Sequence, residues 1–183
     1  MIRLERVRLN STAFILATAM ILFMTGPATA DGPAVGQRAP DFSLFSTSGE
    51  KFHLSERQGR TVLMTFWSTW CSRSSDELAF LKKNAELYPS LEIAVVYSGD
   101  PKPDIRSLVY IKQVIDEWDL PASILVDRGQ KVWELFGVKA LPTSFIIDPN
   151  GVLAYGASNF YSSSPDELNT LLGRMSALSM AGQ

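Results

Sequence analysis

The stretch TVLMTFWSTWCSRS, residues 61–74, places the single cysteine of the chain, Cys71, shortly after a nearly continuous apolar run. The run from Thr61 to Trp67 is typical of a strand buried on both faces of a sheet, and therefore of a central strand. Beyond Cys71 the apolar residues recur with helical spacing, which predicts a helix from near Ser72 to Leu87 that ends before Pro89. Cys71 is therefore expected where a buried strand passes into a helix.

Strands and helices alternate along the rest of the chain, which predicts an α/β fold with a central mixed sheet flanked by helices. The last two strands are expected to form an antiparallel hairpin, because Asp148-Pro149-Asn150-Gly151 is a strong turn sequence. In chain order, the other predicted elements are an N-terminal β-hairpin (41–45 and 51–54), a strand (93–97), a helix (105–118), a strand or extended segment (124–126), the hairpin (143–147 and 152–155) and a last helix after the N-cap Ser164.

The first thirty residues resemble an export signal. Three arginines at positions 3, 6 and 8 precede an apolar run from Ala13 to Met24, and the small-residue pattern Ala28-Thr29-Ala30 follows. Twelve residues in a helix cover about 18 Å, less than the roughly 30 Å hydrocarbon core of a bilayer. This favours a signal peptide cleaved after Ala30 over a retained N-terminal membrane anchor, and it predicts a periplasmic or otherwise exported protein without a stable membrane span.

One domain is expected in the mature chain. Residues 31–37 contain two glycines and a proline without an apolar period, which indicates a short linker. Residues 38–180 carry all the predicted strands and helices and form the domain.

Composition excludes several classes of function. The 183 residues include 17 Lys and Arg against 19 Asp and Glu, without a basic cluster, so nucleic-acid binding is not expected. One cysteine and one histidine cannot make an internal disulfide, a cysteine-based zinc site or a histidine-rich metal cluster. Neither a metal nor another cofactor is predicted, and any redox chemistry must use the thiol of Cys71.

The predicted position of Cys71 favours a reactive thiol. The free N–H groups and positive dipole end at a helix N-terminus stabilise a thiolate, and Arg73 adds a nearby cation. The dipole contributes only about 0.3 to 1 kcal/mol, so a moderately acidic thiol is expected. The alternative is that Cys71 is a small buried hydrophobic residue, which is common for a free cysteine.

Four segments resemble the TlpA/ResA-type branch of exported thioredoxin-fold thiol-disulfide oxidoreductases. They are FWSTWC (66–71), GVKALPT (137–143), FIIDPNG (145–151) and VGQRAPDF (35–42), and the likeness covers roughly residues 35–178. The resemblance implies a thioredoxin fold with an N-terminal β-hairpin extension and an active site at Cys71. It also implies that Trp70, Ser72 and Arg73 flank this site, and that Pro142, before Thr143, is a cis-proline packed against it.

The chain departs from this family at Ser74, where the family carries its second, resolving cysteine. A serine hydroxyl cannot form a disulfide, so the protein cannot cycle between a dithiol and an internal disulfide. The ordinary dithiol reductase activity of the family is therefore not expected.

Other polar and aromatic residues receive plainer interpretations. Thr65 occupies the position of a buried acid in cytosolic thioredoxins and is expected to be an ordinary strand residue. His53 is expected on the surface or an edge strand rather than as a base for Cys71. Glu77 is interpreted as an acid of the first helical turn, with proton buffering near the site as the alternative. Trp118 and Trp133 are expected in the core.

Three functions remain open. The first is a monothiol thiol-disulfide oxidoreductase in which Cys71 forms a mixed disulfide with a cysteine-containing client protein or a small thiol. The second is a binding module that has lost redox turnover and holds cysteine-containing clients during assembly of cytochromes or metal centres. The third is a thiol peroxidase, although Met64 stands where peroxiredoxins carry a proline, and only Ser68 fits their pattern.

Overall fold

The computed structural model describes residues 31–71, 74–98, 104–117, 119–158 and 165–181. The expected signal peptide and its cleavage site lie outside the described residues, as do Ser72, Arg73, Trp118 and Ser164.

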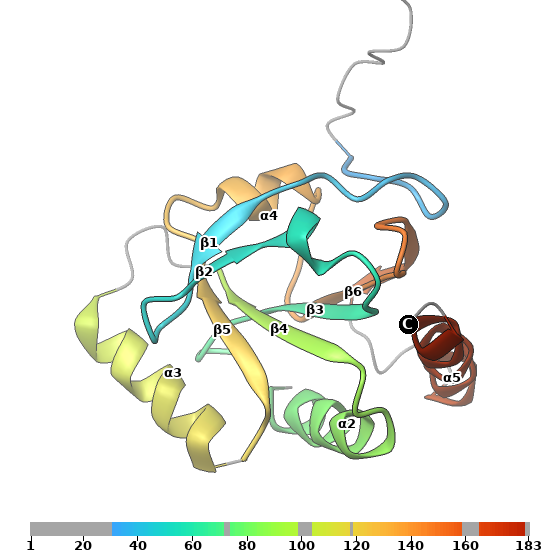
Figure 1. The fold of residues 1–183 in the computed structure, drawn as a ribbon. Coiled ribbons are helices and arrows are strands. Elements are labelled where there is room, and N and C mark those ends of the chain that lie inside the picture. The colour runs from blue at the N-terminus through green and yellow to red at the C-terminus, as the bar shows by residue number, and fades with distance from the viewer. Residues whose placement is uncertain (1–30, 72–73, 99–103, 118, 159–164, 182–183) are drawn as a thin grey trace, which may run out of the picture.

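Strand β3 (Val62–Trp67) is the middle strand of a five-stranded sheet (Figure 1). The strand order is β5-β4-β3-β6-β7, with β4 spanning Glu92–Tyr97, β5 Ala122–Val126, β6 Thr143–Ile147 and β7 Leu153–Ser158. β3 pairs in parallel with β4 and antiparallel with β6, so the sheet is mixed. All six residues of β3 are buried, which confirms the central strand predicted from its apolar run.

Two apolar layers cover the two faces of the sheet. Helices α2 (Ser74–Leu87), α3 (Ile105–Glu117) and α5 (Pro165–Ala181) pack against the face that includes Leu63 and Trp67. The hairpin of β1 (Ser43–Phe45) and β2 (Lys51–His53), the 3-10 helix η1 (Leu54–Arg57) and helix α4 (Lys131–Leu135) cover the face that includes Met64 and Phe66. The β1–β2 hairpin confirms the predicted N-terminal extension.

Helix α4 was not predicted, because five residues are too few to show a helical period. The buried carboxylate of Asp127 accepts hydrogen bonds from the backbone N–H groups of Val132 (3.1 Å) and Trp133 (2.8 Å). It also accepts one from the hydroxyl of Ser98 (3.3 Å), at the end of β4. Asp127 therefore ties the start of α4 to the carboxyl ends of β4 and β5.

Replacing Asp127 by alanine is expected to lower the free energy of unfolding by about 2 to 3 kcal/mol, because it leaves several buried donors without their acceptor. Chemical denaturation measures this change. Asp116→Ala is the matched control, since Asp116 pairs with Lys112 on the exposed face of α3 and such pairs contribute less than about 1 kcal/mol. Equal losses in the two variants would contradict the role given to Asp127.

The segment predicted as a linker is packed onto the domain. The N–H of Gly36 donates to the carbonyl of Leu153 (2.8 Å), and the N–H of Leu153 donates to the carbonyl of Gln37 (2.8 Å). Residues 36 and 37 therefore extend the sheet pairing at the start of β7. The sequence did not indicate this pairing, because the segment has no periodic apolar residues. The domain boundaries themselves stay a prediction.

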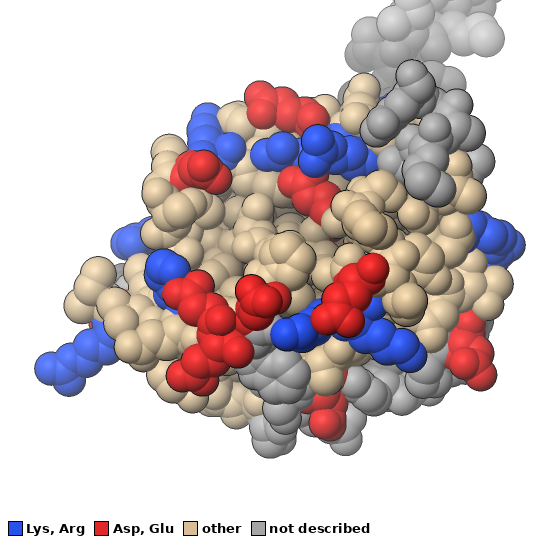
Figure 2. Space-filling view, turned by 60° about the horizontal axis from the view of Figure 1, so that its bottom comes forward, with Lys and Arg blue, Asp and Glu red and all other residues tan. Residues whose placement is uncertain are grey.

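Charged side chains of both signs lie next to one another on the surface. Figure 2 shows Lys and Arg interspersed with Asp and Glu on the face that it presents. Among the helices of the described part of the chain, none combines the length and apolar character that crossing a bilayer requires.

Candidate functional site

Cys71 follows β3 at the carboxyl end of the central strand. Its backbone N–H donates to the carbonyl of Ser68 (3.2 Å), and the residue is half-buried. Trp70 beside it is 66% exposed, which is unusual for so large an aromatic residue. Helix α2 begins three residues later, at Ser74. The chain therefore places its only thiol at the predicted strand-to-helix junction, in a half-buried position.

Strand β6 brings Pro142 and Thr143 to the same end of the sheet. In the antiparallel register Thr143 lies opposite Phe66, so Pro142 lies beside the end of β3 that leads to Cys71. The Leu141–Pro142 peptide bond is cis, and both Pro142 and Thr143 are buried. The hydroxyl of Thr143 donates to the carbonyl of Ala140 (2.6 Å), which holds the turn before the proline.

A buried polar cluster lies between these elements. Glu77 is in the first turn of α2, and its side chain is fully buried, with 0% of the residue exposed. Its Oε1 atom accepts hydrogen bonds from the hydroxyls of Thr65, in β3, and Ser144, in β6 (2.7 Å for Ser144). The cluster therefore joins the strand that precedes Cys71, the helix that follows it and the strand that follows Pro142.

The three oxygens of this cluster lie close together. Thr65 Oγ1 and Ser144 Oγ lie 2.7 Å apart, so each oxygen is within hydrogen-bonding distance of the other two. Both hydroxyls donate to Oε1 of Glu77, and hydrogen bonds of this kind stabilise the charged carboxylate.

Burial acts in the opposite direction and has the larger effect. It raises the pKa of Glu77 from 4.5 to about 7, while the hydrogen bonds from Thr65 and Ser144 oppose part of the rise. Glu77 can therefore gain or lose a proton near neutral pH.

The structure confirms that Glu77 is an acid of the first helical turn and adds that its side chain is buried in the core. Thr65 is a strand residue as expected, but its hydroxyl also donates to Glu77. A signal for Glu77 was present, since it lies four residues before Leu81 and shares the buried side of α2. Ser144 was missed, because only the pairing of β6 with β3 places it beside Thr65.

The other singled-out residues lie outside the cluster of Thr65, Glu77 and Ser144. His53 is in β2, in the separate two-stranded sheet, as expected of an edge-strand histidine. Trp133 is partly buried against the core, where its ring meets Phe66 edge-on at 6.2 Å. Among the described residues, no group of His, Cys, Asp and Glu could hold a metal ion.

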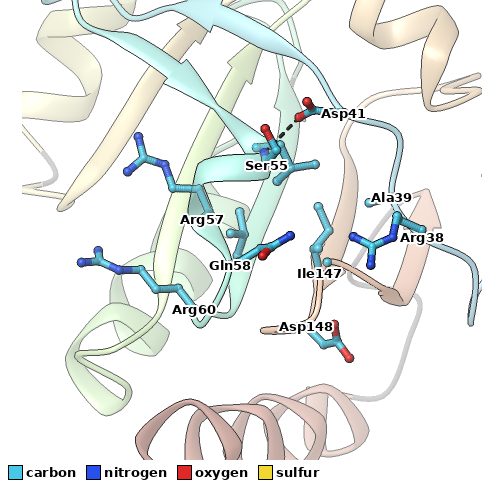
Figure 3. Close-up of a pocket in the computed structure, with 12 residues that line it drawn as sticks. Arg38, Ala39, Asp41, Ser55, Arg57, Gln58, Arg60, Ile147 and Asp148 are labelled. Carbon is cyan, nitrogen blue, oxygen red and sulfur yellow. Dashed lines mark hydrogen bonds between the residues drawn. The ribbon is translucent and has the colours of Figure 1, made fainter. Parts of the chain in front are cut away.

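A small cavity of about 70 Å³ lies at the opposite end of β3, between the start of β3 and the end of β6. Figure 3 shows Arg57 and Arg60 directed to one side of this cavity and Arg38 on the other. Arg57 and Arg60 both pair with Glu92, at 3.2 and 3.6 Å. The cavity therefore lies at the edge of the sheet away from Cys71, and two of its cations are already paired.

Comparisons with known proteins show what the chain is similar to. The sequence model of the AhpC/TSA family matches residues 35–156, two thirds of the chain. The thiol-disulfide oxidoreductase ResA of Geobacillus thermodenitrificans is 35% identical over 123 residues, which are 64% of this chain and 66% of ResA. The thioredoxin-like protein YneN of Bacillus subtilis is 33% identical over 136 residues, which are 74% of this chain and 78% of YneN.

Solved structures share the fold. A crystal structure described as a candidate thiol:disulfide interchange protein DsbE from Chlorobium tepidum aligns with a TM-score of 0.66 at 24% identity, over 78% of this chain and 98% of that one. This likeness establishes the thioredoxin-like fold, and the sequence relatives establish the ancestry. The chain belongs to the AhpC/TSA family of redoxins and is a thioredoxin-like homologue of the thiol-disulfide oxidoreductase ResA.

Proposed function

We propose that the protein is a monothiol thiol-disulfide oxidoreductase that acts through Cys71. The observation that carries this proposal is the position of the only cysteine of the chain. Cys71 is half-buried after the carboxyl end of β3, at the same end of the sheet as Pro142. The relatives named thiol-disulfide oxidoreductases support the reaction class. The ResA match spans 66% of ResA, so the client belongs to the proposal: a cysteine-containing protein or a small thiol.

The reaction has two exchange steps. The thiolate of Cys71 attacks one sulfur of a client disulfide, a new sulfur–sulfur bond forms between Cys71 and the client, and the other client sulfur leaves as a thiolate. A second thiol, from the client or from solution, then attacks the mixed disulfide and releases Cys71 as the thiolate. Because Ser74 offers no sulfur, the second step depends on a thiol from outside the chain.

Mass spectrometry of the protein after exposure to a disulfide-containing peptide tests the proposal. The wild type is expected to gain one peptide half as an adduct that dithiothreitol removes, and Cys71→Ala is expected to gain none. Non-covalent binding of the peptide by both proteins, without an adduct on the wild type, would favour the binding module. Faster reaction of Cys71 with hydrogen peroxide than with the peptide would favour the thiol peroxidase.

We further propose that the protein is exported and processed after Ala30. The support is the charged start, the twelve-residue apolar run and the Ala28-Thr29-Ala30 pattern. Expressed with its full leader in a bacterium, the protein is expected in the periplasmic fraction with a mass that corresponds to a start at Asp31. A full-length species in the membrane fraction would show that the leader is retained as an anchor.

A further inference from the structure

The segment before β1 meets the segment before Pro142 in a close backbone contact. Gly32 and Gly137 both have left-handed backbone angles, with φ of 77° and 62°. A Cβ atom on Gly32 would lie 2.3 Å from the carbonyl oxygen of Phe136, and one on Gly137 would lie 2.4 Å from the carbonyl oxygen of Asp31. No residue with a side chain fits at either position without displacement of the other segment.

The same segment is held at its other end by the sheet. Besides the bonds between residues 36–37 and Leu153, the N–H of Ala39 donates to the carbonyl of Gly151 (2.9 Å). The side chain of Gln37 accepts a hydrogen bond from the N–H of Ala34 (3.0 Å), which keeps the turn between the two attachment points. Residues 31–39, here called the N-terminal strap, therefore link the start of β7 to Gly137. Figure 1 shows the start of this segment beside the end of α4.

Gly137 is the first residue of the connection that leads to Pro142. Residues 137–142, here called the proline loop, follow α4, with Val138 buried and its N–H bonded to the carbonyl of Trp133 (3.0 Å). Lys139 and Ala140 are exposed, and Leu141 is half-buried. Several contacts hold this loop, and the one at its start is the close contact between Gly137 and Gly32.

We propose that the N-terminal strap positions the proline loop for client binding, with Gly32 as the positioning residue. This inference rests on the proposed function, because it concerns how a client peptide lies against Pro142 while Cys71 attacks its disulfide. A side chain at position 32 would displace the start of the loop, and a displacement of about 1 Å in a binding segment can slow a reaction by up to about a hundredfold. Cys71 follows β3 and is not part of the strap or the proline loop, so the reactivity of its thiol should change little.

The test compares Gly32→Ala with Gly36→Ala in the full chain. Gly36 also has a left-handed backbone, with φ of 89°, but a Cβ atom there meets nothing within 4 Å. Both variants thus carry the same kind of backbone cost, and only Gly32→Ala overlaps the proline loop. We expect the rate of mixed-disulfide formation with a disulfide-containing peptide to be about tenfold lower in Gly32→Ala than in Gly36→Ala. The rate of Cys71 alkylation by iodoacetamide should agree between them within about twofold.

Amide hydrogen exchange at residues 138–141 gives a second readout that needs no client. Exchange there should be faster in Gly32→Ala than in Gly36→Ala. Equal peptide rates in the two variants, or a parallel fall in alkylation, would overturn the proposal. If even the wild type forms no mixed disulfide, the proposed function has failed, and the exchange data alone decide whether Gly32 holds the loop.

Gln37→Ala keeps the test decisive if Gly32→Ala does not fold, because it removes one exposed hydrogen bond of the strap and adds no overlap. It is expected to lower the peptide rate in the same direction but by less. Faster hydrogen exchange of the strap amides with an unchanged peptide rate would overturn the proposal.

Discussion

Replacing Ser74 by cysteine is expected to turn the protein from one that depends on an outside thiol, and resolves its mixed disulfide slowly, into one that turns over rapidly. Ser74 is the first residue of α2 and follows Cys71 by three positions, a spacing that a disulfide can bridge at a helix N-terminus. An intramolecular thiol can reach an effective concentration of about 10⁵ M, whereas an external thiol acts at millimolar concentration. Resolution of the mixed disulfide should therefore be at least about a thousandfold faster in the variant.

Reduction of insulin by dithiothreitol measures this change. The wild type is expected to add little to the uncatalysed rate, and Ser74→Cys to show turnover with an internal disulfide visible as a loss of two thiols. Ser90→Cys is the matched control, since Ser90 lies beyond the far end of α2 and a second cysteine there should not restore turnover. If the wild type turns over as fast as Ser74→Cys, the residue at position 74 is not what limits the reaction. If the disulfide forms in Ser74→Cys without activity, the client-binding surface has diverged and the binding module is favoured.

The sequence predicts best the strands and helices whose burial leaves a regular apolar pattern. A strand buried on both faces is apolar throughout, and a helix buried on one side has apolar residues at helical spacing. β3 is buried on both faces and is apolar throughout, and α3 buries one side at regular spacing. β5 was ambiguous between a strand and an extended segment, because its state depends on its pairing with β4 and on a bridge from Ser46 to Leu125. α4 depends on a single buried carboxylate, Asp127, rather than on a repeated pattern.

The sequence pointed to those residues of the candidate site that lie in short motifs, and it did not point to the buried polar cluster beside them. Cys71, Ser74 and Pro142 lie in short motifs, so a resemblance could identify them from the sequence. The cluster of Thr65, Glu77 and Ser144 lies in three separate elements, and two of its members are hydroxyl residues of ordinary strands. Its existence follows from the register in which Ser144 faces Thr65 across β3 and β6, and single-sequence patterns do not give register between strands 79 positions apart.

Glu77→Gln is expected to remove a pH dependence of stability that the wild type shows between about pH 4.5 and 7. The pKa of Glu77 is raised in the folded state to about 7 from 4.5, so the folded protein holds a proton that the unfolded chain releases in this range. Stability from this group is therefore fully present below pH 4.5 and is lost as the pH rises to about 7. The free energy of unfolding should fall by about 3 kcal/mol over this interval.

Urea denaturation at steps between pH 4 and 8 measures the free energy of unfolding of the wild type and of Glu77→Gln. The difference between the two values removes the contributions of the other carboxylates, because both proteins share them. Glutamine can accept and donate as the protonated acid does, so Glu77→Gln should match the wild type near pH 4 and exceed it by about 3 kcal/mol near pH 8. Glu86→Gln is the matched control, because Glu86 is exposed on the same helix, and it should follow the wild type at every pH. A constant difference between Glu77→Gln and the wild type across the range would mean that Glu77 has the same charge in the folded and unfolded chains. Burial would then not raise the pKa of Glu77 in the folded protein, and the inference that this carboxyl holds a proton near neutral pH would be wrong.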